Sequence, residues 1–140
     1  MDRIDKINYY LDIAQTIMDR GTCLHANYGA IIVKDDVIVS TGCSNKVRQD
    51  DASLNQVNST DPTCCKEHAE ATAIFAVPRE LMLGATLYLM GRDMQTGEIL
   101  TEGPCMMCYR LILKARIAWV VNRISPVDYN VVQVGWTESK

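Results

Sequence analysis

The feature that most constrains this chain is a pair of short motifs that must meet in space although they lie far apart in the sequence. The first is His68-Ala69-Glu70 and the second is Pro104-Cys105-Met106-Met107-Cys108. A zinc ion in a protein takes four tetrahedral ligands, and a site with only three protein ligands keeps one position open for water. His68, Cys105 and Cys108 supply three such ligands, and Glu70 is left over. The sequence therefore predicts a catalytic metal site and a fold that brings the two motifs together.

Both motifs are predicted to stand at the starts of helices. Residues 67–77 are rich in alanine and helical in pattern, and the ring of Pro78 excludes a continuing helix. A second helix over residues 105–115 is expected to begin after the Gly103-Pro104 turn. Cys105 and Cys108 are three residues apart in its first turn, so both can point at one ion. The positive ends of the two helix dipoles favour thiolate ligands and a developing negative charge.

The remaining pattern predicts an α/β domain. Apolar residues at helical spacing predict a first helix over residues 4–18, and β-branched runs predict a hairpin over 28–34 and 37–42. Further strands are expected at 85–90, 117–121 and, with a weaker pattern, 131–134. The connection from 85–90 through helix 105–115 to 117–121 is a parallel βαβ crossover. We expect a three-layer α/β/α domain with a mixed sheet of about five strands.

Length and charge narrow the class of partner. The 140 residues suit one domain, 1–140, and 14 basic against 17 acidic residues give a net charge of −3. The chain therefore has no basic field that would draw it onto nucleic acid or an anionic membrane, which favours a small-molecule substrate. No run approaches the roughly 20 apolar residues of a membrane span, and the first residues lack the apolar core of a signal peptide. We expect a cytoplasmic protein.

Six cysteines are present. Without a secretion signal their thiols are expected to be reduced, and metal binding is then the better use for a Cys-x-x-Cys pair. Cys23, Cys43, Cys64 and Cys65 could form an accessory metal site, although buried inert thiols are the simpler interpretation.

The free carboxylate indicates the type of reaction. Zinc can lower the pKa of bound water to about 7, and a nearby carboxylate can take up and return the proton. Glu70 is two residues past His68, so it can reach such a water without being a ligand. It is the natural general base, and it can then deliver a proton to a departing amine. Hydrolysis of an amidine-like carbon with release of ammonia needs such a pair.

With these motifs the chain resembles the cytidine and deoxycytidylate deaminase superfamily, whose zinc enzymes carry His-x-Glu and Pro-Cys-x-x-Cys. The resemblance runs from about residue 21 to 121 and is strongest for the deoxycytidylate-deaminase-like branch. It implies a cytidine deaminase-like fold, a zinc cofactor, a homo-oligomer, and deamination of a cytosine-type base, nucleoside or nucleotide. It also implies substrate contacts from the backbone N–H of Ala69, from Asn45 after the second strand, and from Pro104.

Two alternatives stay open from the sequence. The first is a purine-type deaminase acting on guanine, adenine or tRNA adenosine, because the tRNA enzymes share the Pro-Cys-x-Met-Cys form. The net negative charge of the chain argues against a tRNA partner. A non-catalytic zinc module that only joins two helices is the other, and it would need a fourth protein ligand.

Two segments bear on the choice of substrate. Residues 44–65 are polar with little periodicity and are predicted to form a long loop. Residues 91–103 stand where the family commonly makes a short turn, and we expect this insertion to overhang the metal site.

Overall fold

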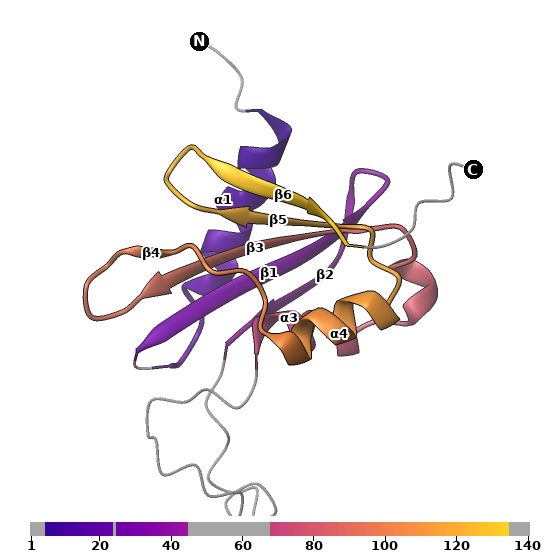
Figure 1. The fold of residues 1–140 in the computed structure, drawn as a ribbon, viewed down its shortest axis with the longest axis horizontal. Helices are drawn as coiled ribbons and strands as arrows, with labels where there is room; N and C mark the ends of the chain where they lie inside the picture. Colours follow the sequence, from indigo (N-terminus) through magenta and orange to yellow (C-terminus); the bar gives the residue numbers. More distant parts are fainter. Residues whose placement is uncertain (1–4, 24, 45–67, 135–140) are drawn as a thin grey trace, which may run out of the picture.

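The structure is a computed structural model that describes residues 5–23, 25–44 and 68–134. Figure 1 shows a twisted mixed sheet in which five strands follow one another in the order β2-β1-β3-β5-β6, while β4 pairs with β3 beside this path. The strands are β1 (Ala26–Lys34), β2 (Val37–Cys43), β3 (Thr86–Asp93), β4 (Ile99–Leu100), β5 (Trp119–Arg123) and β6 (Tyr129–Gln133).

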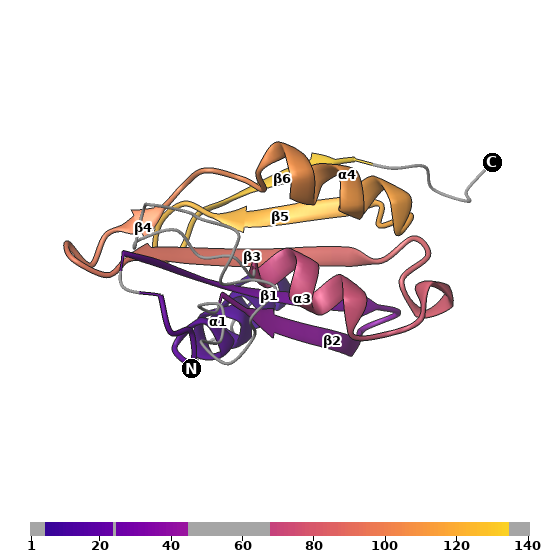
Figure 2. The same ribbon diagram turned by 90° about the horizontal axis from the view of Figure 1, so that it is seen from below.

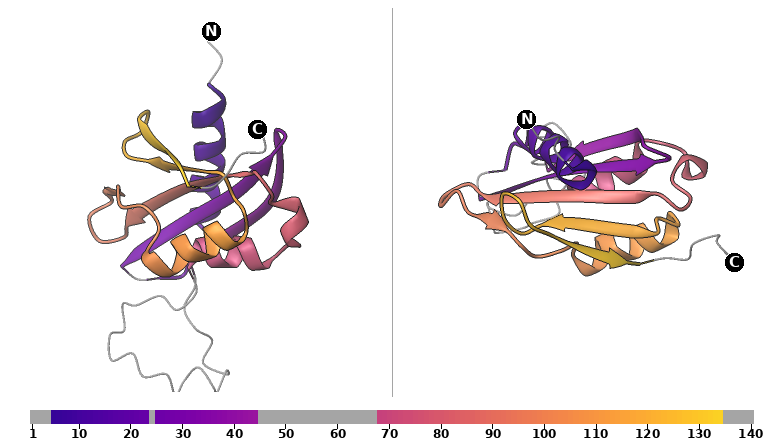
Figure 3. Two further views of the ribbon diagram at one scale, coloured as in Figure 1. Left: turned by 45° about the vertical axis from the view of Figure 1, so that its right-hand side comes forward. Right: turned by 90° about the horizontal axis from the view of Figure 1, so that it is seen from above.

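Helices cover both faces of this sheet, which confirms the predicted three layers. Helix α1 (Lys6–Met18) lies on one face, whereas α3 (Ala69–Phe75) and α4 (Met106–Lys114) lie on the other (Figures 2 and 3). A short 3₁₀ turn, η1 (Arg79–Leu81), follows Pro78. Within the described ranges no helix is long and apolar enough to cross a bilayer.

The predicted crossover is present. Strands β3 and β5 pair in parallel, from Thr86 opposite Trp119 to Leu89 opposite Asn122, and α4 lies between them in the sequence. Strand β4 was not predicted. It pairs with β3 at Gly91 and Arg92, beyond the last residue of β3 that pairs with β5. Residues 91–100 therefore extend the sheet, and only residues 101–105 form the connection into α4.

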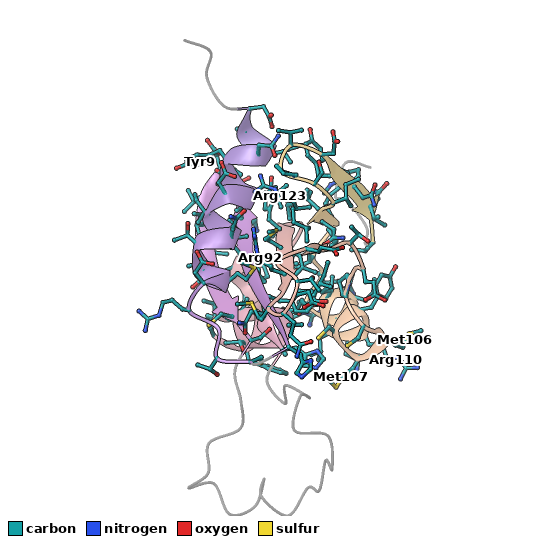
Figure 4. All side chains as sticks on the ribbon, turned by 90° about the vertical axis from the view of Figure 1, so that its left-hand side faces the viewer. Tyr9, Arg92, Met106, Met107, Arg110 and Arg123 are labelled. Atoms are coloured by element: carbon teal, nitrogen blue, oxygen red, sulfur yellow. The ribbon has the colours of Figure 1, made fainter. Side chains whose placement is uncertain are left out.

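Helix α1 is attached to its face of the sheet by apolar packing and by one arginine. Asp5 caps the helix by accepting a hydrogen bond from Asn8 N at 2.9 Å. Arg123 of β5 is 2% exposed, and its guanidinium donates to Asp12 Oδ1 and to Asn8 Oδ1, each at 2.8 Å. Figure 4 shows this arginine reaching α1. A cation so buried is stable only because carboxylate and amide partners surround it.

Helix α3, which carries two of the motif residues, lies unusually close to strand β2. A Cβ atom on Gly42 would stand 2.6 Å from Ala73 N and 3.0 Å from Thr72 Cβ. Ser40, two residues earlier on β2, donates its hydroxyl hydrogen to Ala73 O at 2.6 Å. The backbone of α3 can approach the strand this closely because residue 42 has no side chain.

Substitution Gly42→Ala should therefore displace α3 and destabilise the protein. The clash is with helix backbone that cannot rotate away, so we expect a loss of at least about 1–3 kcal/mol in the free energy of unfolding, as for other overpacked sites. Urea unfolding measures it. Gly103→Ala is the matched control, because a Cβ atom there meets nothing within 4 Å. Equal stability of the two variants would contradict this account of the packing.

Candidate metal centre

The three predicted ligands are brought together by the starts of two neighbouring helices. His68 is the N-cap residue of α3, and Cys105 is the N-cap residue of α4, both with extended backbone conformations. Cys108 follows in the first turns of α4. Helices α3 and α4 pack against each other on the same face of the sheet (Figure 1). Sequence-distant motifs therefore meet because the crossover places α4 beside α3.

Distances among the donor atoms suit a single zinc ion. His68 Nδ1 lies 3.6 Å from Cys105 Sγ and 3.5 Å from Cys108 Sγ, and the three ligand atoms all lie within 4.8 Å of one another. A tetrahedral zinc with a Zn–N distance of about 2.0–2.1 Å and a Zn–S distance of about 2.3 Å sets each N···S separation at about 3.6 Å. The side chains thus already have the spacing that the ion requires.

The ligands differ in their exposure. Cys108 is completely buried, His68 is half-buried and Cys105 is exposed. Burial raises the pKa of the Cys108 thiol, and the negative charges of Glu70 and Cys105 raise it further. A cation bound to the sulfur has the opposite effect, because it stabilises the thiolate. We therefore expect the Cys108 thiol to lose its proton as it binds the metal.

Glu70 lies in the first turn of α3 beside this group. Its side chain is only 5% exposed, and burial raises the pKa of its carboxyl, with smaller opposing effects from a backbone hydrogen bond and from the charge of His68. A carboxyl whose pKa is raised holds a proton more readily than an exposed carboxyl does. This is the behaviour expected of a group that transfers protons.

The other predicted site residues are found in different positions. Ala69 is fully buried at the start of α3, directly between His68 and Glu70. Pro104 is half-buried and immediately precedes Cys105. Asn45 lies outside the described residues, as do Cys64 and Cys65 of the suggested accessory site. Cys23 is buried and disulfide-bonded, which differs from our expectation of reduced thiols.

Tyr28 is a residue of this region that sequence reasoning missed. It lies in β1 opposite Gly91 of β3 and is half-buried against the core under α3 and α4. Burial raises the pKa of its hydroxyl, and the negative charges of Glu102, Glu70 and Cys105 raise it further. The side chain therefore lies within the electrostatic field of the metal-binding group. Its signal in the sequence is faint, because only the strand register brings Gly91 opposite Tyr28.

A buried side-chain amide of β5 fixes the connection between β4 and α4. Asn122 of β5 is 6% exposed and donates from Nδ2 to the carbonyl oxygen of Thr101 at 2.7 Å. This bond holds the segment that ends at Cys105. Beyond it, Met106 and Met107 are 68% and 54% exposed and project from the start of α4 (Figure 4).

Comparison with known families gives one extensive match. The family described as the cytidine and deoxycytidylate deaminase zinc-binding region matches residues 4–123. Deoxycytidylate deaminase of Mycobacterium phage D29 is 30% identical over 134 residues, which cover 86% of this chain and 96% of the phage protein.

Solved structures have the same fold at lower identity. Cytidine deaminase from Burkholderia pseudomallei superposes with a TM-score of 0.62 at 19% identity, covering 94% of each chain. The dCMP deaminase of cyanophage S-TIM5 gives a TM-score of 0.58 at 19% identity, covering 88% of this chain and 86% of that one. These likenesses confirm the cytidine deaminase-like α/β fold.

Proposed function

Because this chain belongs to the cytidine and deoxycytidylate deaminase zinc-binding family, and is thus a zinc-dependent hydrolase of C–N bonds, we propose that its single domain deaminates a cytosine-type substrate in the cytoplasm. The product is the corresponding uracil-type ring together with ammonia. The observation that carries the proposal is the near-equal spacing of His68 Nδ1 from the sulfur atoms of Cys105 and Cys108, with the Glu70 carboxyl buried beside them. A zinc module that only joins two helices is inconsistent with this family.

In this proposal His68, Cys105 and Cys108 hold the zinc ion. When bound, zinc supplies a Lewis acid that activates water for attack on the ring carbon bearing the amine. The two helix N-termini add backbone N–H groups and positive dipole ends, which favour the negative charge that develops during attack.

Glu70 is proposed to move the protons. Its carboxylate accepts a proton from the attacking water, and the neutral acid donates that proton to a ring nitrogen. The carboxylate then accepts a second proton, from the new hydroxyl group on the ring carbon, and donates it to the amine that leaves as ammonia. Burial supports the acid role, since it stabilises the neutral carboxyl group and raises its pKa. One residue therefore serves as base and as acid within a turnover.

Substrate contacts are proposed for three residues. The backbone N–H of Ala69 is close to the reacting ring because the residue stands between His68 and Glu70 at the start of α3. Pro104 borders the same space ahead of Cys105. Asn45, which follows β2 in the sequence, is proposed to contact the sugar where the substrate has one.

Among cytosine derivatives we propose a deoxycytidylate-type nucleotide, since the phage relative of this name is matched over 96% of its length. Ammonia release from cytosine, cytidine, dCMP, isocytosine, adenine and guanine derivatives tests the proposal. Fastest turnover of a cytosine derivative supports the ring class, and preference for dCMP over cytidine supports the nucleotide. Fastest turnover of a purine would refute both.

We also propose that the enzyme is a homo-oligomer. Met106, Met107 and Leu113 leave large apolar surfaces exposed on α4, at 68%, 54% and 39%. Exposed apolar patches commonly mark interfaces, because burying them between copies removes them from water. Light scattering gives the mass in solution, and a monomer at micromolar concentration would contradict the proposal.

A further inference from the structure

Strands β1 and β3 pair a large aromatic residue with a glycine on the face of the sheet that carries the metal centre. At the pair formed by Tyr28 and Gly91, one position has a large aromatic side chain and the other has none. A Cβ atom on Gly91 would lie 2.5 Å from Cδ1 and 3.0 Å from Cζ of the tyrosine ring. The ring therefore lies directly over the backbone of Gly91, and any larger residue there would displace it.

This position is on the face of the sheet that carries the metal centre. Tyr28 belongs to the half-buried residues on the face covered by α3 and α4, the same face that carries His68 and Cys105. The backbone of Tyr28 is fixed as well, because its N–H donates to Ser44 Oγ at 3.1 Å and its carbonyl accepts from Ser44 N at 3.1 Å. The backbone that carries the ring is thus fixed, and the side chain is only half-buried.

Charged groups of the metal centre act on the hydroxyl of this ring. The negative groups that act on it belong to Glu70, which lies beside the ligands, to Cys105, which is a ligand, and to Glu102 of the connection into α4. These three residues come from α3, from the start of α4 and from the segment between β4 and α4. The negative charges of all three raise the pKa of the Tyr28 hydroxyl, which supports a position of the ring beside the metal centre on this face of the sheet.

We propose that Tyr28 is a specificity-determining residue whose ring forms an aromatic wall for the flat heterocycle of the substrate, and that Gly91 is a positioning residue that leaves the room for this ring. The proposal rests on the deaminase function proposed above and deepens it. Planar bases bind well against aromatic rings because both present polarisable faces. The wall contributes to substrate binding and orientation, whereas proton transfer belongs to Glu70.

The test compares three variants by their steady-state constants with the best substrate of the wild-type enzyme. Tyr28→Leu removes the flat ring and should raise KM by about 10-fold to 100-fold, in line with the loss of one base–aromatic contact. Its effect on kcat should be smaller than its effect on KM. Tyr28→Phe keeps the ring and should restore KM to within about threefold of wild type. Gly91→Ala displaces the ring and should raise KM as Tyr28→Leu does.

Zinc content and the visible spectrum of the cobalt-substituted protein should be unchanged in both Tyr28 variants, since the ring is not a ligand. Tyr129→Leu is the matched control, because Tyr129 packs on the α1 side of the sheet, and its KM should equal that of wild type. A wild-type KM in Tyr28→Leu, equal KM values for the Phe and Leu variants, or loss of zinc in either would overturn the proposal. The wild-type substrate panel alone decides the reaction, so the two proposals fail separately.

Discussion

Substitution Glu70→Gln should leave a folded protein with a full complement of zinc and almost no turnover. The amide has the shape of the carboxyl group but cannot take up a proton, and general acid–base groups contribute about 10²- to 10⁴-fold to rate. We expect kcat to fall by at least that factor, because the same side chain is proposed to act in more than one proton transfer. Because the Glu70 side chain is buried, another acidic side chain has little room to take over its role.

The measurement is kcat for ammonia release together with the zinc content per chain. Glu80→Gln is the matched control, since Glu80 is an exposed glutamate of η1 that has no part in the metal centre. Wild-type turnover in Glu70→Gln would refute the mechanism, and loss of zinc from it would make Glu70 a supporting residue of the metal site.

Substitution Cys108→Ser should abolish stoichiometric zinc binding and with it all activity. Cys108 is the ligand that is completely buried, and its sulfur lies 3.5 Å from His68 Nδ1. A serine hydroxyl is a much poorer ligand for zinc than a thiolate, and two remaining protein ligands do not form the usual catalytic set. Metal analysis of the purified variant should give far less than one zinc per chain.

The same variant should also lose its stabilisation by zinc. A ligand that binds only the folded state contributes about 2.7 kcal/mol when its free concentration is 100 times Kd. We expect added zinc to stabilise chelator-treated wild-type protein against urea, and to leave Cys108→Ser unchanged. Cys43→Ser, a cysteine change outside the metal-binding group, should keep the zinc response. Stoichiometric zinc in Cys108→Ser would mean that the ligand set is wrong.

The metal centre could be predicted from the sequence because zinc chemistry limits the residue types of its ligands and local helix geometry sets their spacing. Few residue types bind zinc, and the spacing of Cys105 and Cys108 is set by one helical turn. His68 is likewise placed by the helix that begins after it. What joins the two halves is the crossover between β3 and β5, and the apolar runs of those strands made it recognisable.

The substrate side of the site could not be predicted in the same way. Strand β3 was expected to end at residue 90, because Gly91, Arg92 and Asp93 do not have a strand composition. Pairing with β1 on one side and with β4 on the other keeps them in the sheet. The position of Tyr28 depends on this extension, since its partner is Gly91. Long-range pairing thus decided a feature that local propensity contradicts.

The sheet also divides the molecule into two parts that can evolve separately. Alternate residues of each strand point to opposite faces, so the buried cluster under α3 and α4 and the cluster under α1 have no residue in common. Substitutions in the α1 cluster can change thermal tolerance without altering any side chain that lines the metal site. For directed evolution of this enzyme, heat resistance and substrate preference can therefore be selected in separate libraries and combined afterwards.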